Sequence, residues 1–209
     1  MELWIGWGEY KSITFAVFGV FAVLCKFFLN VPWTFSLRNS VLCVAFFGGY
    51  YMFYPQFGLR EFFTQIPPQL IPIISIVFLA DKYKGLVMNN ITKWYAWLLT
   101  ISIPIYILTT LVNIPSFGIL SNGDRYGSFV NYIFYVKEIG RFGTSISRFS
   151  GPFLEPGYVG MMGAFLLFVN KFDFKRRDIQ VILLSVLLSL SLAGWVLAFI
   201  GYFEIQYYK

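Results

Sequence analysis

The sequence predicts an all-α, polytopic integral membrane protein with about six transmembrane helices. Of its 209 residues, 58% are hydrophobic and only 12% are charged. Soluble domains carry roughly 25% charged residues, so this chain has too little polar surface to coat a water-soluble globule. Its mean hydropathy is +0.68, and long apolar runs alternate with short charged breaks. These observations exclude a nucleic-acid binder, a disordered chain and an ordinary cytosolic enzyme.

Six apolar runs are candidate membrane spans, each of which needs about 20 residues. In chain order they cover residues 13–29, 41–57, about 62–80, 94–112, 157–169 and 179–203. The third run is interrupted by three prolines and the fifth is short, so these two are the weakest candidates. The runs are too long for barrel strands, and only helices or closed barrels satisfy the backbone in lipid. We therefore expect a single transmembrane domain over residues 1–209, with no sheet of consequence.

The basic residues predict the orientation of this domain. The short loop 81–93 holds three lysines, and the short loop 171–178 holds four lysines or arginines. Both loops are expected in the cytoplasm, because short cytoplasmic loops carry an excess of basic residues. An even number of spans separates the two loops, so both lie on the same side of the membrane and the two assignments agree. The long stretch 113–156 between them is then expected to be external.

The external stretch 113–156 is where we expect the chemistry. It carries seven charged side chains: Asp124, Arg125, Lys137, Glu138, Arg141, Arg148 and Glu155. Apolar residues recur within it at i, i+3, i+4 and i+7, from Phe129 to Val136, which predicts a short interfacial helix near residues 128–139. The alternative is a surface helix that merely covers the bundle.

The end of this stretch, residues 148–157, is more specific. Gly151-Pro152 and Pro156-Gly157 bracket a stiff turn that leads into an apolar helix. Glu155 would lie at the N-cap of that helix or just outside it, near the positive end of its dipole. Arg141 and Arg148 are seven residues apart and would share a face of a continuous helix, where two guanidinium groups suit phosphate oxygens. The alternative is structural: Glu155 only caps the helix, and the arginines meet lipid headgroups.

Two segments carry a resemblance to a known family. Arg-Phe-Ser-Gly-Pro-Phe-Leu-Glu-Pro-Gly at 148–157 is followed by an apolar helix, a basic loop and Leu-Ser-Leu-Ser-Leu-Ala-Gly at 188–194. This arrangement resembles bacterial O-antigen and capsule polymerases of the Wzy type, in the O-antigen ligase-like superfamily. The close resemblance covers about residues 141–203. Elsewhere the chain agrees with the family only in hydropathy.

The resemblance implies a multi-pass glycosyltransferase of the bacterial inner membrane with a GT-C-like fold. Such enzymes of cell-envelope polysaccharide biosynthesis join oligosaccharide repeat units carried on undecaprenyl pyrophosphate, at the external face, for lipopolysaccharide or capsule. The implied partners are these lipid-linked oligosaccharides, membrane lipids, a flippase and a chain-length regulator. No cofactor, metal or nucleic acid is expected.

The residue chemistry of the external stretch fits that reaction. A lipid pyrophosphate leaving group gains negative charge as the glycosidic bond breaks, and guanidinium groups stabilise that charge. Arg148 is the first candidate for this role and Arg141 the second, and Arg141 and Arg125 are candidate substrate contacts. With no histidine in the chain, a carboxylate is the available base, and Glu155 is the candidate. Glu155 alternatively orients Arg148 or only holds the turn.

The chain also departs from the family. Family members are longer, with a second external loop after the region matched here, and this chain stops at about that point. Related ligases carry a functional histidine in that loop. A second hypothesis is therefore a non-catalytic component, either truncated or accessory, of an envelope polysaccharide assembly.

Overall fold

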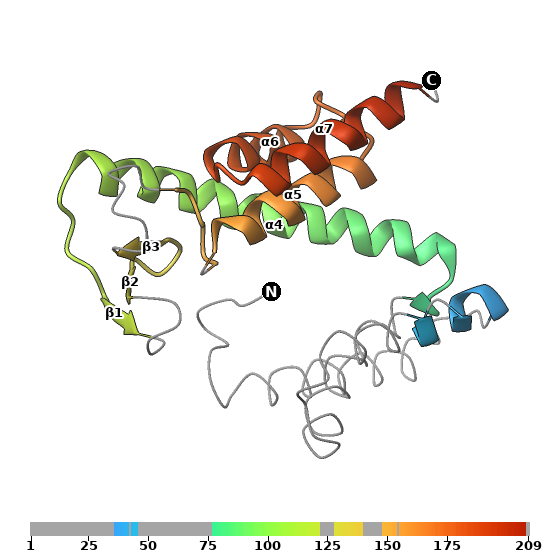
Figure 1. Ribbon diagram of the computed structural model, residues 1–209, viewed down its shortest axis with the longest axis horizontal. Helices are drawn as coiled ribbons and strands as arrows, with labels where there is room; N and C mark the ends of the chain where they lie inside the picture. The colour runs from blue at the N-terminus through green and yellow to red at the C-terminus, as the bar shows by residue number, and fades with distance from the viewer. Residues whose placement is uncertain are drawn as a thin grey trace, which may run out of the picture. The chain divides into compact units, whose positions relative to one another are not determined.

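A computed structural model describes residues 36–41, 43–45, 77–121, 128–139, 148–153 and 155–207. The described chain is mostly helical and also contains a small sheet, which corrects the all-α prediction (Figure 1). It falls into two compact units that divide between Val87 and Met88. The expected run 13–29 lies outside the described residues, as do most of the runs 41–57 and 62–80.

Helical turns at residues 37–41 and 43–45 belong to the first unit. The Ser36 hydroxyl accepts a hydrogen bond from the backbone N–H of Asn39 at 3.2 Å, as at a helix N-cap. The buried Asn39 amide donates to the carbonyl of Val77 at 3.1 Å. One side chain thus joins two parts of this unit that are 38 residues apart.

Helix α4 covers Asp81–Leu111. Its 31 residues span about 46 Å, and among the described helices it alone is long and apolar enough to cross a membrane. The expected loop at 81–93 is wrong, because those residues form the first turns of this helix. Asp81 favours the helix start through the dipole, and its ion pair with Lys84 at 2.8 Å supports the first turn.

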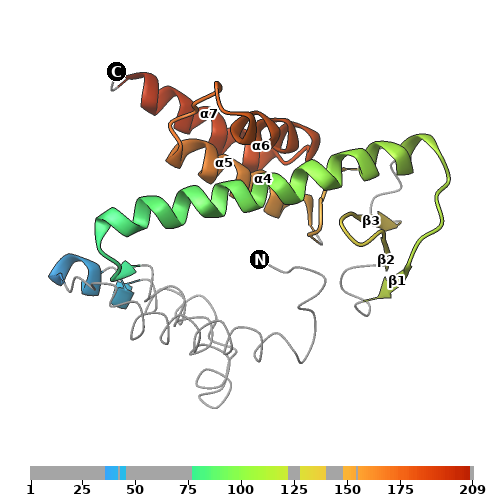
Figure 2. The ribbon, with the colours of Figure 1, turned by 180° about the vertical axis from the view of Figure 1, so that it is seen from behind.

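Three shorter helices pack beside α4, as both views of the ribbon show (Figures 1 and 2). They are α5 (Pro156–Val169), α6 (Arg177–Leu188) and α7 (Leu192–Tyr207). The expected single helix over 179–203 is wrong, because it breaks at residues 189–191, with Leu190 at a φ of 48°.

The directions of these helices follow from their contacts. Gly160 of α5 lies against Gly194 of α7, and Phe168 further along α5 lies against Gly201, so α5 and α7 run parallel. Helix α6 runs antiparallel to both: Gly160 lies against Ser189, and Gly163 lies against Ile182. The N-terminus of α5 and the C-terminus of α6 therefore share one end of the bundle.

The sheet is an antiparallel meander of three strands, β1 (Gly118–Ser121), β2 (Ser128–Asn131) and β3 (Val136–Ile139). The expected interfacial helix over 128–139 is wrong, since these residues form β2, β3 and their turn. Asn131 explains the difference: its side-chain oxygen accepts a hydrogen bond from the N–H of Ile133 at 2.8 Å, which favours a turn over a helix.

An aromatic cluster joins α4, the sheet and the turn before α5. Tyr95 of α4 stacks on Phe153 at 5.8 Å between ring centroids, and Tyr135 stacks on Phe149 at 6.2 Å. These four rings are almost completely buried. The cluster fixes the turn at 148–155 against α4, and that turn carries two of the predicted site residues.

Candidate functional site

Arg148 contacts the break between α6 and α7. Its Nε donates to the carbonyl of Ser189 at 3.3 Å, and one Nη donates to the carbonyl of Leu190 at 3.1 Å. The neighbouring N–H of Phe149 donates to the carbonyl of Leu188 at 3.1 Å. The last carbonyls of a helix lack partners within that helix. Arg148 and Phe149 therefore close the C-terminus of α6.

The serines of the break end one helix and begin the next. The Ser189 hydroxyl donates to the carbonyl of Val186 at 2.7 Å and accepts from the N–H of Ser191 at 3.3 Å. The Ser191 hydroxyl then accepts from the N–H of Gly194 at 3.2 Å, which is an N-cap bond for α7. This pattern explains why an apolar segment turns back here.

The turn before α5 lies where the sequence predicts it. Gly151 has a φ of 57°, in the left-handed region. A Cβ at this position would also lie 3.3 Å from a methyl group of Leu99. Glycine is therefore favoured both by the backbone conformation and by the limited space. The N–H of Phe153 donates to the carbonyl of Ser150 at 3.1 Å and closes the turn.

Glu155 is the N-cap residue of α5, and Pro156 follows at the first helical position, as the sequence predicts. The Glu155 carbonyl accepts from the N–H of Tyr158 at 3.1 Å. Its half-buried carboxylate makes no side-chain capping hydrogen bond. Helix capping through the carboxylate, the structural alternative for this residue, is therefore not what the geometry shows.

These residues gather at one end of the bundle. We call the turn 148–157 together with the break 188–194 the motif cluster. Its two parts are about 40 residues apart in sequence and meet through Arg148 and through Gly160, which follows the turn and lies against Ser191. Arg125 and Arg141, the predicted substrate contacts, lie outside the described residues.

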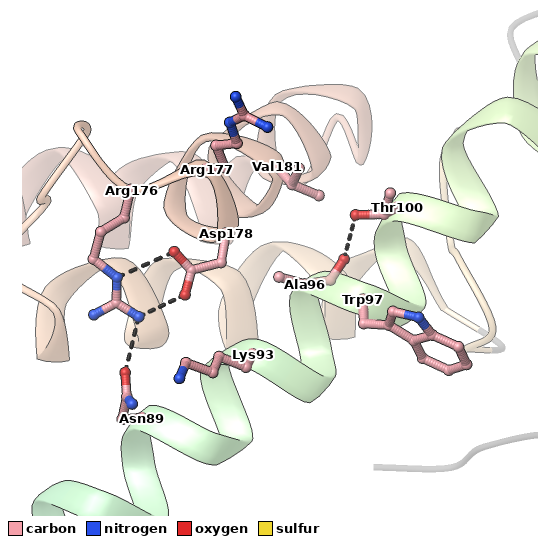
Figure 3. Close-up of a pocket in the computed structure, with 9 residues that line it drawn as sticks. All are labelled: Asn89, Lys93, Ala96, Trp97, Thr100, Arg176, Arg177, Asp178 and Val181. Carbon is pink, nitrogen blue, oxygen red and sulfur yellow. Dashed lines mark hydrogen bonds and ion pairs between the residues drawn. The ribbon is translucent and has the colours of Figure 1, made fainter.

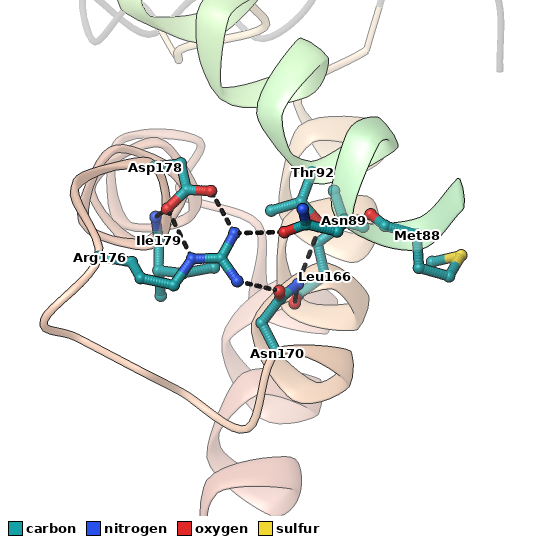
Figure 4. A network of polar contacts seen from close by, with 8 residues as sticks. All are labelled: Met88, Asn89, Thr92, Leu166, Asn170, Arg176, Asp178 and Ile179. Atoms are coloured by element: carbon teal, nitrogen blue, oxygen red, sulfur yellow. Dashed lines mark hydrogen bonds and ion pairs between the residues drawn. The ribbon is translucent and has the colours of Figure 1, made fainter. Parts of the chain in front are cut away.

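A second polar group, not predicted from the sequence, lies at the other end of the bundle (Figure 4). Arg176 binds Asp178, with Nη–Oδ2 at 2.5 Å, and donates to the side-chain oxygens of Asn89 and Asn170, both at 2.9 Å. The Asn170 amide donates to the Thr92 hydroxyl at 2.9 Å. We call these five residues the polar network. In the sequence, only the charge run at 171–178 pointed to this place, and by itself it indicated the orientation of the chain in the membrane and not a network.

The ion pair in this network shifts the pKa of both groups. The hydrogen bond from Arg176 lowers the pKa of the Asp178 carboxyl, and partial burial opposes this only in part. The same bond raises the pKa of the Arg176 guanidinium. Both groups are charged at neutral pH, so the network contains a fixed pair and not a proton donor.

A cavity of about 700 Å³ opens beside the polar network (Figure 3). It is lined by Asn89, Lys93, Ala96, Trp97, Thr100, Arg176, Arg177, Asp178 and Val181. Neither Arg148 nor Glu155 belongs to this lining. In the part of the chain that the structure describes, no group of three or more histidine, cysteine or acidic side chains is placed to hold a metal ion.

Comparison with models of known families, with curated proteins and with solved structures finds no match to this chain.

Proposed function

We propose that this chain is a multi-pass inner-membrane protein of bacterial envelope polysaccharide assembly, which joins repeat units carried on undecaprenyl pyrophosphate at the external face. One observation carries the proposal. The two segments on which the family resemblance depends, 148–157 and 188–194, meet in space through the hydrogen bonds of Arg148. Parts of a motif that converge on one place are typical of a site, whereas unrelated short similarities have no reason to meet.

The surface of the bundle supports the membrane location. Helix α7 exposes a set of large apolar side chains: Leu192, Trp195, Val196, Leu197, Phe199, Ile200 and Phe203. Soluble proteins rarely expose contiguous apolar patches of this kind, whereas a lipid environment favours them. Together with α4, this surface supports a chain embedded in a bilayer, and a multi-pass membrane protein with a GT-C-like arrangement remains our proposal for the whole chain.

The helix lengths suggest a depth for the motif cluster. Helix α5 spans about 21 Å and α6 about 18 Å from their charged loop at 170–176. The hydrocarbon core is about 30 Å thick, so a loop at the cytoplasmic surface puts the cluster inside the outer part of the membrane. Irregular backbone at that depth requires partners from the protein, and Arg148 supplies them. An arginine at such a depth is a functional-site candidate.

The proposed reaction breaks the bond between the anomeric carbon of the donor chain and its phosphate oxygen. The acceptor sugar hydroxyl forms the new bond to that carbon, its proton passes to Glu155, and undecaprenyl pyrophosphate leaves with the bonding electrons. Guanidinium groups stabilise the growing negative charge on the leaving group. Arg125 and Arg141 are proposed as substrate contacts. Arg148 uses two donors to hold the helix break, so its positioning role accompanies any contact with pyrophosphate.

The hydrogen bonds of Arg148 favour one alternative function. An arginine whose Nε and Nη both bind backbone carbonyls has a structural role, which a protein without catalytic activity also needs. The second candidate is therefore a non-catalytic component of the same assembly, in which the motif cluster only maintains the helix break.

The experiment is complementation of a strain that lacks its polymerase. Glu155→Gln keeps the shape of the side chain but cannot accept a proton, and the thermal midpoint in detergent checks that its fold is retained. We expect this variant to abolish long polysaccharide at normal membrane levels, while the matched control Glu204→Gln, on the exposed part of α7, retains it. Full-length polysaccharide from Glu155→Gln would overturn the catalytic role, and failure of the unmodified chain would favour the accessory component.

Arg148→Lys separates chemistry from structure in the same assay. Lysine keeps the charge but cannot bind two carbonyls in a fork. A catalytic contribution predicts a loss of polysaccharide larger than the fall in protein level and thermal stability explains. A purely structural role predicts that protein level and thermal stability fall together with the polysaccharide.

A further inference from the structure

The cavity beside the polar network is polar at one end and apolar at the other. Asn89, Lys93, Arg176 and Asp178 line it near the start of α6. Further along α4 and α6, its lining is Ala96, Trp97, Thr100 and Val181. Both helices run from the polar end towards the apolar end. The lining therefore changes from polar to apolar along the helix axes, over roughly 16 Å of α4.

At the apolar end, the hydroxyl of Thr100 is already hydrogen-bonded within its own helix. The Thr100 hydroxyl donates to the carbonyl of Ala96, in its own helix, at 2.7 Å, and Figure 3 draws this bond. The hydroxyl of Thr100 is therefore used within α4, and Ala96, Trp97 and Val181 complete the lining at this end. Such a lining fits hydrocarbon and not water.

The polar end carries excess positive charge. Three basic residues and one acidic residue line the cavity, which leaves a net charge of +2. Asp178 is bound to Arg176 and does not neutralise the others. Lys93 forms no ion pair or hydrogen bond with the described residues, and in Figure 3 it points towards the Arg176–Asp178 pair. Arg177 is exposed at the rim and points away from Lys93.

We propose that this cavity binds one anionic phospholipid, with its phosphate at Lys93, beside the start of α6, and an acyl chain along the apolar lining at Ala96, Thr100 and Val181. The ligand must be both negatively charged and amphipathic, because the two ends of the cavity differ in this way. A free phosphate satisfies only the polar end, and a neutral lipid leaves the charge of Lys93 uncompensated. The site lies at the opposite end of the bundle from the motif cluster. It rests on the membrane location proposed above and not on polymerase activity.

The test is native mass spectrometry of the full chain purified in neutral detergent, titrated with phosphatidylglycerol or with phosphatidylcholine of the same acyl chains. We expect one phosphatidylglycerol to bind in preference to phosphatidylcholine. The double variant Lys93→Gln with Arg177→Gln should weaken that binding about tenfold, since the contact of Lys93 and the positive charge of Arg177 at the rim are both lost. Neither side chain has a partner among the described residues, so the fold should be retained.

The matched control is Lys82→Gln with Lys175→Gln, which removes the same charge from exposed positions outside the cavity lining. It should keep phosphatidylglycerol binding within about twofold. Equal weakening by both double variants would overturn the site, because general surface charge would then explain the binding. Absence of a preference for phosphatidylglycerol would overturn it as well.

Two further arms separate this site from its alternatives. Inorganic phosphate alone should not raise the melting temperature, whereas phosphatidylglycerol should; protection by phosphate alone would assign the cavity to a soluble anion and overturn the lipid. Glu155→Gln should bind phosphatidylglycerol as the unmodified chain does. A failure of the polymerase proposal therefore leaves this measurement unaffected, and a failure of lipid binding leaves the polymerase proposal unaffected.

Discussion

Gly194 leaves no room for a side chain between α5 and α7. A Cβ at this position would lie 2.6 Å from the Cα and carbonyl carbon of Gly160 and 2.9 Å from its oxygen. These are backbone atoms, which cannot rotate away as a side chain can. The small residue is therefore required by the distance between the two helices and not by the conformation of the chain.

Gly194→Ala should destabilise the protein by about 1–3 kcal/mol, because the two helices must separate to admit a methyl group. The measurement is the shift in thermal or denaturant midpoint in detergent. The control is Gly85→Ala in α4, where no atom lies within 4 Å of the new Cβ. That change should stabilise by up to about 1 kcal/mol through helix propensity. Equal midpoints for the two variants would contradict the close packing of α5 against α7.

Asp178 makes stability depend on pH. Its pKa is lowered in the folded protein, chiefly by the hydrogen bond from Arg176. A lowered pKa contributes stability above the ordinary carboxyl pKa of about 3.9, and this contribution is lost as pH falls through the folded value. The carboxylate also accepts from the N–H of Ile179 at 3.1 Å. Removing its charge therefore affects both the polar network and the start of α6.

Asp178→Asn should cost about 1–2 kcal/mol at pH 7, between the values for exposed and buried pairs. The difference from the unmodified chain should stay constant down to about pH 5 and shrink below about pH 4, where the unmodified carboxyl also takes up a proton. Thermal midpoints between pH 3.5 and 7 measure this. Asp173→Asn, an exposed control in the loop before α6, should change stability little. A pH-independent difference would argue against the charge of Asp178 as the cause.

At the scale of elements, two serines show how differently a buried hydroxyl acts. The Ser150 hydroxyl donates to the carbonyl of Val136 in β3, and the N–H of Val136 donates to the carbonyl of Gly151 at 3.0 Å. The Ser185 hydroxyl donates to the carbonyl of Val181, in its own helix, at 2.8 Å. The first bond joins the turn to the sheet, and the second adds nothing between elements.

Ser150→Ala should therefore destabilise by about 1–2 kcal/mol, because a buried carbonyl at the strand loses a partner. Ser185→Ala should change stability by less than about 0.5 kcal/mol, since alanine favours the helix and the Val181 carbonyl keeps its backbone bond. Denaturation of both variants in detergent provides the comparison. Similar losses from both would show that the attachment of the sheet to the turn does not matter for stability.

At the scale of the whole molecule, the break at 189–191 changes the expected topology. A single helix over 179–203 would carry the chain to the external side after the cytoplasmic loop 171–178. The structure instead returns α7 parallel to α5, with Phe168 of α5 beside Gly201 of α7. The C-terminal end of α7 is therefore expected on the same side as the loop.

Single cysteines introduced at Lys175, Gln206 and Asn122 in a cysteine-free background test this arrangement. Positions 175 and 206 should react with a membrane-impermeant reagent only from the cytoplasmic side, and position 122 only from outside. The two basic segments and the return of α7 are the reasons. Labelling of position 206 only from outside would support an unbroken membrane-spanning helix over 179–203. Labelling of position 122 only from the cytoplasm would overturn the orientation and the proposed mechanism.

The sequence by itself determined the features that depend on neighbouring residues. The helical character follows from long apolar runs, and the start of α5 follows from the Glu155–Pro156 pair, since proline is favoured at the first helical position. The stiff turn at Gly151 follows from local conformational preference. Each of these is set within a few residues of the chain.

Tertiary structure alone decided the features that depend on distant partners. The spacing from Phe129 to Val136 is compatible with one helical face, yet twelve residues are too few for a helix without packing, and partners on α4 and in the turn favour strands. The break at 189–191 is stable because Arg148, about 40 residues away, supplies donors to its carbonyls. The polar network likewise combines Asn89, Asn170 and Arg176 from three parts of the chain. A single sequence does not reveal such pairings, because they depend on the distance in space between residues that are far apart along the chain.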